Sequence, residues 1–344
     1  MDKVFFRRKN FALTLIGLGV VVILVSALLD FIRGETVIKL GLIQYGGLGL
    51  GALLLAVGLS LFSQKAGTFF VYLITAVSAG LFAIGVALTL LNIFGELVSL
   101  RNPALYQGVF YAGKLRVPQY TASEASDLMK KIPDETTGEY AHRVTKLVFD
   151  STVHLWENLP DYSEYNHHVP IYENYFLWAM AYFDPQVYTQ YQFCNPEKAI
   201  ERSVSICDQS SRIMQSIWET NGMKARMVTL DGHTVAEARL DKDQGIWWVL
   251  DADYGVVLEY DIKTLEQHPE IIKASYMQAG YSAEIAEKLA GYYGPDGNYA
   301  ITDRTQCEKE ALFYRLKWPL PVIAATPFCL IVLISRRRVM HHVK

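Results

Sequence analysis

The chain has 344 residues, of which 51% are hydrophobic, 12% aromatic and only 19% charged. This composition is too apolar for an ordinary soluble protein, and its aromatic content excludes a disordered chain. Four cysteines in this length exclude a small disulfide-rich scaffold. The formal net charge of −3 conceals an asymmetry, because residues 96–317 carry 21 basic and 32 acidic side chains. Such an acidic segment is a poor match for a phosphate backbone, so we expect no nucleic-acid partner.

Four stretches have no charged residue over a length that can cross a bilayer. About 20 apolar residues in a helix span roughly 30 Å of hydrocarbon, so the sequence predicts four transmembrane helices. Three lie in residues 1–95 and the fourth in residues 318–344. A cleaved signal peptide is the alternative for the first stretch, and a buried core helix for the last. The stretches have 19, 25, 30 and 18 residues and are Phe11–Leu29, Leu40–Gln64, Ala66–Gly95 and Trp318–Ser335.

Basic residues gather before the first stretch and after the last one. Lys3 and Arg7–Lys9 precede the first, and Arg336–Arg338 follow the last. Because basic residues favour the cytoplasmic side, we expect a multi-pass protein of the inner (plasma) membrane with both termini in the cytoplasm. Residues 96–317 would then form a periplasmic or extracellular domain. Gly47 and Gly51 indicate close helix packing and association between Gly-rich helices, rather than a phosphate-binding loop, because no strand precedes them.

The first part of the 96–317 domain is mainly helical in its pattern. Apolar spacing predicts helices over Ala122–Lys131 and Tyr140–Glu157. Residues 162–193 are rich in Tyr and Phe. A binding surface for sugar or peptide is one interpretation of these residues, and a packed aromatic layer is the one we favour.

The clearest pattern lies in the core of this domain, about residues 195–262, and indicates an α+β fold. A helix is predicted from an N-cap at Ser205, with Asp208 completing a capping box, to Asn221-Gly222. Three strands with a turn at residues 241–245 follow, and then two more helices. These predicted strands and helices are Ala225–Leu230, Thr234–Leu240, Ile246–Asp251, Ile271–Met277 and Ser282–Gly291.

Cys207 falls in the first turn of the predicted helix. Unpaired backbone N–H groups and the positive end of the helix dipole favour a thiolate there, and the thiolate is the nucleophilic form. A buried, inert thiol is the alternative, because most free cysteines behave as small apolar residues.

The hairpin that follows brings a histidine near two aspartates. If it is centred on Asp243, paired residues have numbers that sum to about 486, so that Val235 faces Asp251 and His233 faces Asp253. An aspartate opposite or diagonal to His233 can accept its ring N–H and select the tautomer.

This order of residues resembles the transglutaminase-like superfamily, a branch of the papain-like cysteine enzymes. The family pattern has a cysteine at a helix start, a Gly-x-x-Ala-Arg turn into a strand, a histidine, and a Trp-x-x-hydrophobic-Asp strand. Ser205, Val235 and Ala252 stand where the family usually has Gly, Trp and Pro. The matching residues here are Cys207, Gly222-Met223-Lys224-Ala225-Arg226, His233 with Glu237, and Trp247-Trp248-Val249-Leu250-Asp251.

The resemblance implies a papain-like domain with a catalytic triad of Cys207, His233 and Asp251 and no cofactor or metal. It also implies acyl transfer, in which a peptidase, amidase or transglutaminase-type enzyme acts on an envelope peptide or conjugate. The competing hypothesis is a non-enzymatic binding module, or an accessory subunit of an envelope assembly or polysaccharide export system. A disulfide between Cys194 and Cys307 is left open.

Overall fold

The computed structural model describes residues 67–103, 110–111, 114–115, 117–154, 168–241, 245–294, 298–301 and 303–342. The chain divides into two compact units, one of residues 1–90 with 318–344 and one of residues 91–317. The predicted spans Phe11–Leu29 and Leu40–Gln64, together with Gly47 and Gly51, lie outside the described residues.

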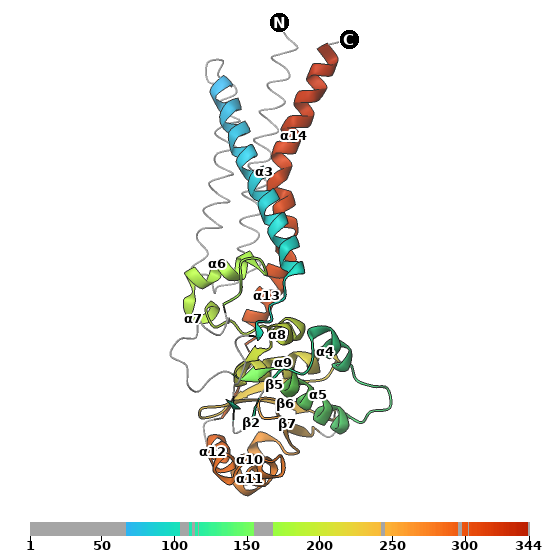
Figure 1. Cartoon of the computed structure of the whole chain (residues 1–344), viewed down its shortest axis with the longest axis vertical. Helices are drawn as coiled ribbons and strands as arrows, with labels where there is room; N and C mark the ends of the chain where they lie inside the picture. Colours follow the sequence, from blue (N-terminus) through green and yellow to red (C-terminus); the bar gives the residue numbers. More distant parts are fainter. Residues whose placement is uncertain are drawn as a thin grey trace. The chain divides into compact units, whose positions relative to one another are not determined.

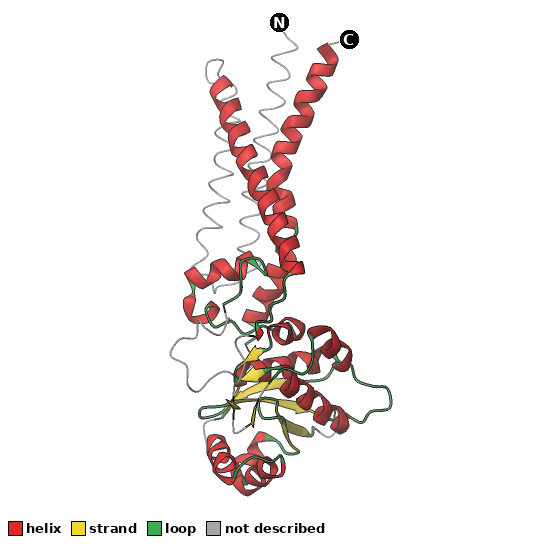
Figure 2. Cartoon of the chain, viewed as in Figure 1, coloured by secondary structure: helices red, strands yellow, loops and turns green. Residues whose placement is uncertain are grey.

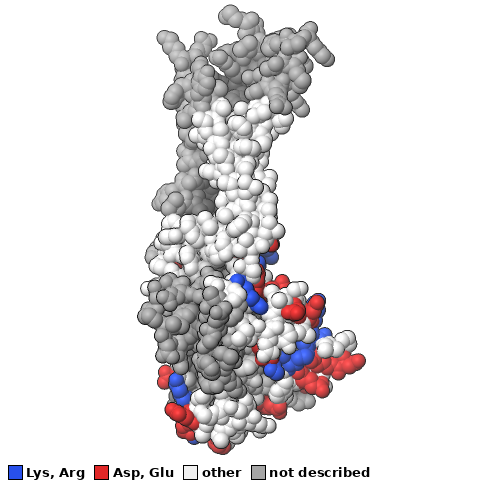
Figure 3. All heavy atoms as spheres, in the orientation of Figure 1, with Lys and Arg blue, Asp and Glu red and all other residues white. Residues whose placement is uncertain are grey.

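Two long apolar helices form the described part of the first unit. They are α3 (Gly67–Leu97), whose last turns belong to the second unit, and α14 (Pro319–His342) (Figure 1). Among the described residues, Ile74–Leu97 and Thr305–Leu333 are long and apolar enough to cross a membrane, by length and composition. Residues 74–90 and 319–333 contain no Lys, Arg, Asp or Glu, in keeping with the white surface of Figure 3.

A glycine lets α3 and α14 approach closely. A Cβ atom built on Gly85 would lie 2.5 Å from the carbonyl oxygen of Pro321 and 3.2 Å from the Cβ of Ala325. The rings of Phe82 and Phe328 also meet, with centroids 5.2 Å apart. A side chain at position 85 would therefore separate the two helices.

A five-stranded antiparallel sheet is the centre of the second unit (Figure 2). Its order is β8-β7-β6-β5-β9, and β6 pairs with β7 so that Ala236 faces Leu250 and Glu237 faces Val249. The numbers of these pairs sum to 486, so the predicted hairpin register is confirmed. The strands are β5 (Ala225–Thr229), β6 (Thr234–Arg239), β7 (Trp247–Asp251), β8 (Val256–Leu258) and β9 (Tyr299–Ile301).

Helices cover both faces of this sheet and divide the core in two. On one face, α9 packs against β5, β6 and β7, where the small side chains of Ala236 and Ala238 admit it. Side chains alternate along a strand, so Val235 of β6 and Val249 of β7 point to the other face. There they pack with the helices that follow β8. The first layer holds α4 (Ala122–Leu128), α5 (Thr137–Ser151), α8 (Pro196–Arg202) and α9 (Cys207–Thr220), and the second holds α10 (Ile262–Gln267), α11 (Pro269–Gln278) and α12 (Ala283–Tyr293).

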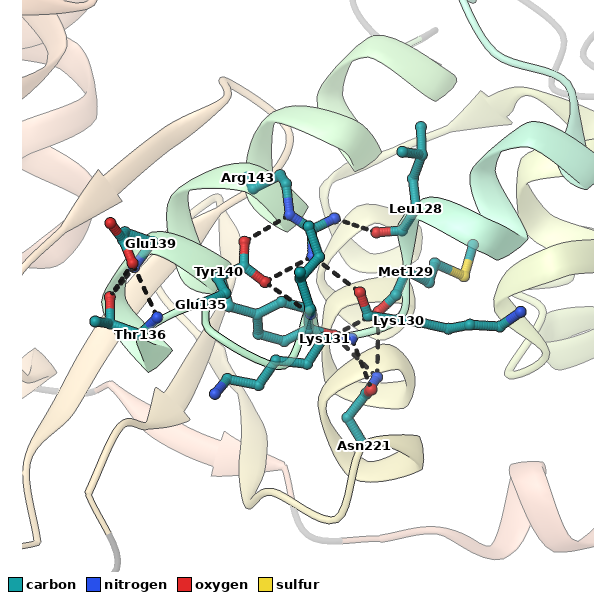
Figure 4. A network of polar contacts seen from close by, with 11 residues as sticks. Leu128, Met129, Lys130, Lys131, Glu135, Thr136, Glu139, Tyr140, Arg143 and Asn221 are labelled. Atoms are coloured by element: carbon teal, nitrogen blue, oxygen red, sulfur yellow. Dashed lines mark hydrogen bonds and ion pairs between the residues drawn. The ribbon is translucent and has the colours of Figure 1, made fainter.

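The loop between α4 and α5 is held in place by polar contacts to both of its ends (Figure 4). The guanidinium of Arg143 donates to both carboxylate oxygens of Glu135, at 2.6 and 2.8 Å, and to the carbonyls of Leu128 and Lys130. Asn221, at the end of α9, donates to the carbonyl of Met129 and accepts from the backbone N–H of Lys131, both at 3.3 Å. The end of α9 and this loop are therefore fixed together.

The aromatic-rich segment forms α6 (Tyr175–Phe183), α7 (Pro185–Tyr188) and a buried run before α8. Tyr188, Tyr191 and Phe193 are buried: the rings of Tyr188 and Tyr191 stack with centroids 5.6 Å apart, and Phe193 meets Tyr191 edge-on at 5.4 Å. These contacts support a packed aromatic layer. A disulfide joins Cys194 to Cys307 of α13 (Thr305–Leu316), a pairing that the sequence left open.

Two local predictions are wrong, although the α+β class is confirmed. The helix expected over Tyr140–Glu157 ends at Ser151, because β3 (Val153–His154) then pairs in parallel with β4 (Val204–Ser205). Ser205 is therefore a strand residue and not the N-cap of α9. Ile206 is the N-cap, without a side-chain hydrogen bond, and Ser205 accepts from the hydroxyl of Ser210 at 3.1 Å. The remaining short sheet pairs β1 (Phe110–Tyr111) with β2 (Lys114–Leu115).

Candidate functional site

Cys207 lies in the first turn of α9, as expected, and is the first residue of this helix. Its thiol is free and half-buried. The short β4 strand leads directly into the helix, so the side chain stands at a fixed point where backbone N–H groups are unpaired. The N-cap residue Ile206 does not compete for these N–H groups, because its side chain has no hydrogen-bond acceptor. The first turn is therefore open to an anion or to a carbonyl oxygen.

Buried side chains fix this first turn on two sides. The Gln209 amide donates to the carbonyl of Phe193 at 2.8 Å and accepts from the backbone N–H of the same residue at 2.7 Å. Arg202, itself buried, donates to the Gln209 oxygen at 2.8 Å. On the other side, the hydroxyl of Ser211 donates to the carbonyl of Thr234 at 2.8 Å. Since Thr234 begins β6, this bond places the start of α9 beside the start of that strand.

His233 stands at the entrance of β6, after a tight turn. The carbonyl of His233 accepts from the N–H of Leu230 at 2.8 Å, which closes the turn over Asp231 and Gly232. Gly232 has φ +92°, a conformation that favours glycine. The imidazole lies between the rings of Tyr254 and Tyr292, with centroids 5.5 and 6.2 Å away.

Asp251, the last residue of β7, receives four hydrogen bonds. Its Oδ2 atom accepts from His233 Nε2 at 2.9 Å and from the Tyr276 hydroxyl at 2.5 Å. Its Oδ1 atom accepts from the backbone N–H groups of Asp253 and Tyr254 at 3.1 and 3.3 Å. The carboxylate is buried, and these four donors hold it in one orientation.

The environment of His233 favours the imidazolium. Burial alone would lower the pKa of His233, but the charge of Asp251 and its hydrogen bond raise this pKa well above the usual value. A hydrogen bond to the side chain of Cys207, and the charge that this side chain can carry, act in the same direction. The three side chains that the sequence singled out are thus joined in the order Cys207, His233, Asp251.

A second buried histidine and aspartate lie close to this site. Asp253, the residue expected to face His233, instead binds His154, with 2.6 Å between its Oδ1 atom and Nδ1 of the ring. His154 belongs to β3 and pairs with Ser205, two residues before Cys207. Sequence reasoning missed this pair, because a strand of two residues leaves no periodic signal.

Glu237 is the acidic residue that follows the histidine in the family pattern, and it has a structural partner. It is fully buried and accepts from Arg226 at 2.6 Å and from the N–H of Ile262 at 3.0 Å. It therefore joins β5 to the start of α10 and does not contact His233.

Two of the cavities among the described residues of the second unit are not lined by Cys207. The larger, about 880 Å³, is bordered by both aromatic and charged side chains, among them Tyr120, His142 and Trp248. The smaller, about 650 Å³, borders the Cys194–Cys307 disulfide. Among the described residues, no group of three or more His, Cys, Asp or Glu side chains is placed to hold a metal ion.

Comparison with known proteins adds no relative. No family model, curated protein or solved structure matches the chain. Any function must therefore be argued from the geometry around Cys207.

Proposed function

We propose that the chain is a membrane-anchored cysteine acyl-transfer enzyme that acts on an envelope peptide or conjugate outside the cytoplasm. The observation that carries this proposal is the buried imidazole of His233, which is hydrogen-bonded to Asp251 and interacts with the side chain of Cys207. This is the arrangement that activates a thiol nucleophile. It also agrees with the resemblance of the sequence to the transglutaminase-like superfamily.

In this scheme the sulfur of Cys207 attacks a carbonyl carbon, with His233 holding the proton that the thiol has lost. The backbone N–H of Cys207, unpaired at the helix start, donates to the oxyanion that forms. The imidazolium then protonates the leaving amine as the tetrahedral intermediate collapses to a thioester. Attack by water completes a hydrolysis, whereas attack by an amine forms a new amide. Asp251 keeps the imidazole oriented throughout.

Location outside the cytoplasm has separate support. A disulfide persists in oxidising compartments such as the periplasm and is rare in the cytosol, and the Cys194–Cys307 bond lies in the same unit as Cys207. The two apolar stretches that flank this unit, and the positive charges beyond them, agree with an inner-membrane anchor with cytoplasmic ends.

A binding module without catalysis is the second candidate. The larger cavity favours it, because that cavity is lined by Trp248 and His142 and not by Cys207. In this case the unit would serve an envelope assembly or a polysaccharide export system.

Alkylation rates distinguish the two candidates. Full-length protein in detergent is treated with iodoacetamide at about pH 6, where an ordinary thiol is almost fully protonated. An enzyme is expected to react at Cys207 at least about tenfold faster than free cysteine, and His233→Ala is expected to abolish the advantage. His142→Ala, an exposed histidine near the larger cavity, is the matched control. Reaction no faster than that of free cysteine would favour the binding module.

A further inference from the structure

Helices α6 and α7 carry exposed aromatic and apolar side chains among the described residues of the second unit. Helix α6 contains no charged residue, and its inner side chains Leu177 and Ala181 are buried. On the outside, Tyr182 is 68% and Phe183 47% exposed, and Val187 of α7 is 41% exposed. We call these three residues, with the half-buried Trp178 that packs 5.0 Å from the Tyr182 ring, the α6–α7 face.

Exposed aromatic residues in this number call for an explanation, because a soluble surface normally carries them singly. From Tyr175 to Tyr188 the only charged residue is Asp184. The face therefore offers apolar rings together with the hydroxyl and indole N–H groups of Tyr and Trp. This combination is enriched where a protein meets the boundary between hydrocarbon and water.

Contacts within the second unit hold α6 against the last turns of α3 and against α13. The ring of Tyr172, just before α6, meets Phe94 edge-on at 5.6 Å, and Phe94 belongs to the last turns of α3. Within α6, the Tyr175 hydroxyl donates to the carbonyl of Lys317 at 2.9 Å, and Phe176 stacks on Phe313 at 5.3 Å.

These partners are the ends of the two apolar stretches. Phe94 lies in Ile74–Leu97 and Phe313 in Thr305–Leu333. The Lys317 ammonium also donates to the carbonyl of Glu173 at 3.2 Å, which ties the start of α6 to the residue just before Trp318. Helix α6 is thus anchored, inside the second unit, where the chain passes into both candidate spans.

We propose that the α6–α7 face lies against the phospholipid headgroups of the bilayer that α3 and α14 enter. This inference rests on the membrane anchoring proposed above and does not depend on the catalytic proposal. Burial of Phe183 and Val187 in the interface removes apolar surface from water. Tyr182 and Trp178 keep their polar groups at headgroup level. The face would hold the domain at a defined height above the membrane.

Spin-label accessibility tests this placement on the full-length chain. The protein carries Cys207→Ser and Cys329→Ser, keeps its disulfide, and is reconstituted in vesicles of phosphatidylcholine and phosphatidylglycerol. A nitroxide is attached in turn through Tyr182→Cys, Phe183→Cys and Val187→Cys. Because these side chains are exposed, their replacement removes no core packing. Collisions with oxygen, which concentrates in the bilayer, are compared with collisions with a water-soluble nickel chelate.

Two further labels calibrate the measurement. Met277→Cys on α11 is a domain site of similar exposure, at 52%, and Ile84→Cys on α3 is a span site, at 54%. We expect the face labels to show a several-fold lower nickel-to-oxygen ratio than the label at position 277, and the label at position 84 to show a lower one still.

The other outcomes separate two failures. In the first, the label at position 84 is exposed to lipid, but the labels on the α6–α7 face give the same nickel-to-oxygen ratio as the label at position 277. That result would overturn this inference alone. Shielding of the face from both reagents would also overturn it, because it would mean a protein partner. Nickel access at position 84 would remove the membrane anchor itself, and this inference with it.

Discussion

His233 is the residue on which the proposed chemistry depends, because it interacts with both Cys207 and Asp251. Its buried ring can stay charged only while Asp251 is negative and close. The raised pKa means that the imidazolium persists to a higher pH than in an ordinary histidine and is lost as the pH rises through the folded-state pKa. In the proposed mechanism this positive charge stabilises the thiolate that attacks the substrate.

Replacement of Asp251 by Asn should reverse the shift of His233. The amide keeps the shape but removes the negative charge, so that burial dominates and the pKa of His233 falls below its wild-type value. NMR titration of isotopically labelled histidine in the full-length protein, assigned with His233→Ala, measures this pKa. A midpoint that stays at or above the wild-type value would show that Asp251 does not hold the charge.

Tyr276 is expected to influence the pKa of His233 through its hydrogen bond to Asp251. Burial, followed by the charge of Asp251, raises the pKa of Tyr276 well above its usual value, so its hydroxyl stays protonated and donates. It shares the Oδ2 atom with His233. In Tyr276→Phe that oxygen should interact more strongly with the imidazolium, and the pKa of His233 should rise further.

The control for Tyr276→Phe is Tyr293→Phe. The Tyr293 hydroxyl is also buried and lies 3.5 Å from the Tyr276 hydroxyl, but the bond to Asp251 comes from Tyr276. The same histidine titration applies. Equal midpoints in the two variants would reduce Tyr276 to a packing role.

The sequence predicted part of this site and missed part of it for a physical reason. Strand alternation and hairpin register are local, and they brought His233 near Asp251 correctly. Tyr276 reaches the carboxylate from α11, and the packing of α11 on the sheet is a tertiary contact that no local sequence pattern predicts. The pairing of His154 with Asp253 is likewise a tertiary contact, between residues 99 positions apart.

At the scale of elements, periodicity located helices and strands better than their ends. Helix α9 has the predicted buried face, with Ile213, Met214 and Ile217 in the core. The predicted capping box is wrong because Ser205 pairs with His154 in the β3–β4 sheet. This tertiary pairing overrides the local preference of serine for an N-cap position. Helix α5 ends early for the same reason.

The pairing of α3 with α14 makes a sharp prediction at position 85. Gly85→Val should force the helices apart, at a cost of about 1–3 kcal/mol for overpacking. Gly80→Val is the matched control, because nothing lies within 4 Å of a Cβ atom at that position of the same helix. Thermal unfolding of the two variants in detergent micelles measures the difference. Equal melting temperatures would mean that the close approach at Gly85 contributes nothing.

For the whole molecule, composition and charge were the informative signals. The apolar stretches Ala66–Gly95 and Trp318–Ser335 correspond to long helices, and the acidic segment between them folds as a separate unit. The first two stretches remain predictions. The sequence named Cys194 and Cys307 as a possible disulfide pair, and the structure shows this bond.

Thiol counting checks the disulfide in the protein as isolated from membranes. Alkylation of the denatured chain without reduction should modify only Cys207 and Cys329, and prior reduction should add two more groups. Reduction should also lower stability by about 2–4 kcal/mol, seen as a lower melting temperature. Four modified thiols before reduction would contradict the bond and remove its support for an oxidising compartment.

The central claim is that the sulfur of Cys207 lies within reach of the imidazole of His233. The most direct measurement is cross-linking of the native chain with 1,3-dibromoacetone, a short reagent with two electrophilic carbons, followed by peptide mass spectrometry. The account predicts a Cys207–His233 cross-link that survives in His142→Ala and disappears in His233→Ala. Alkylation of Cys207 without any link to His233 would contradict it.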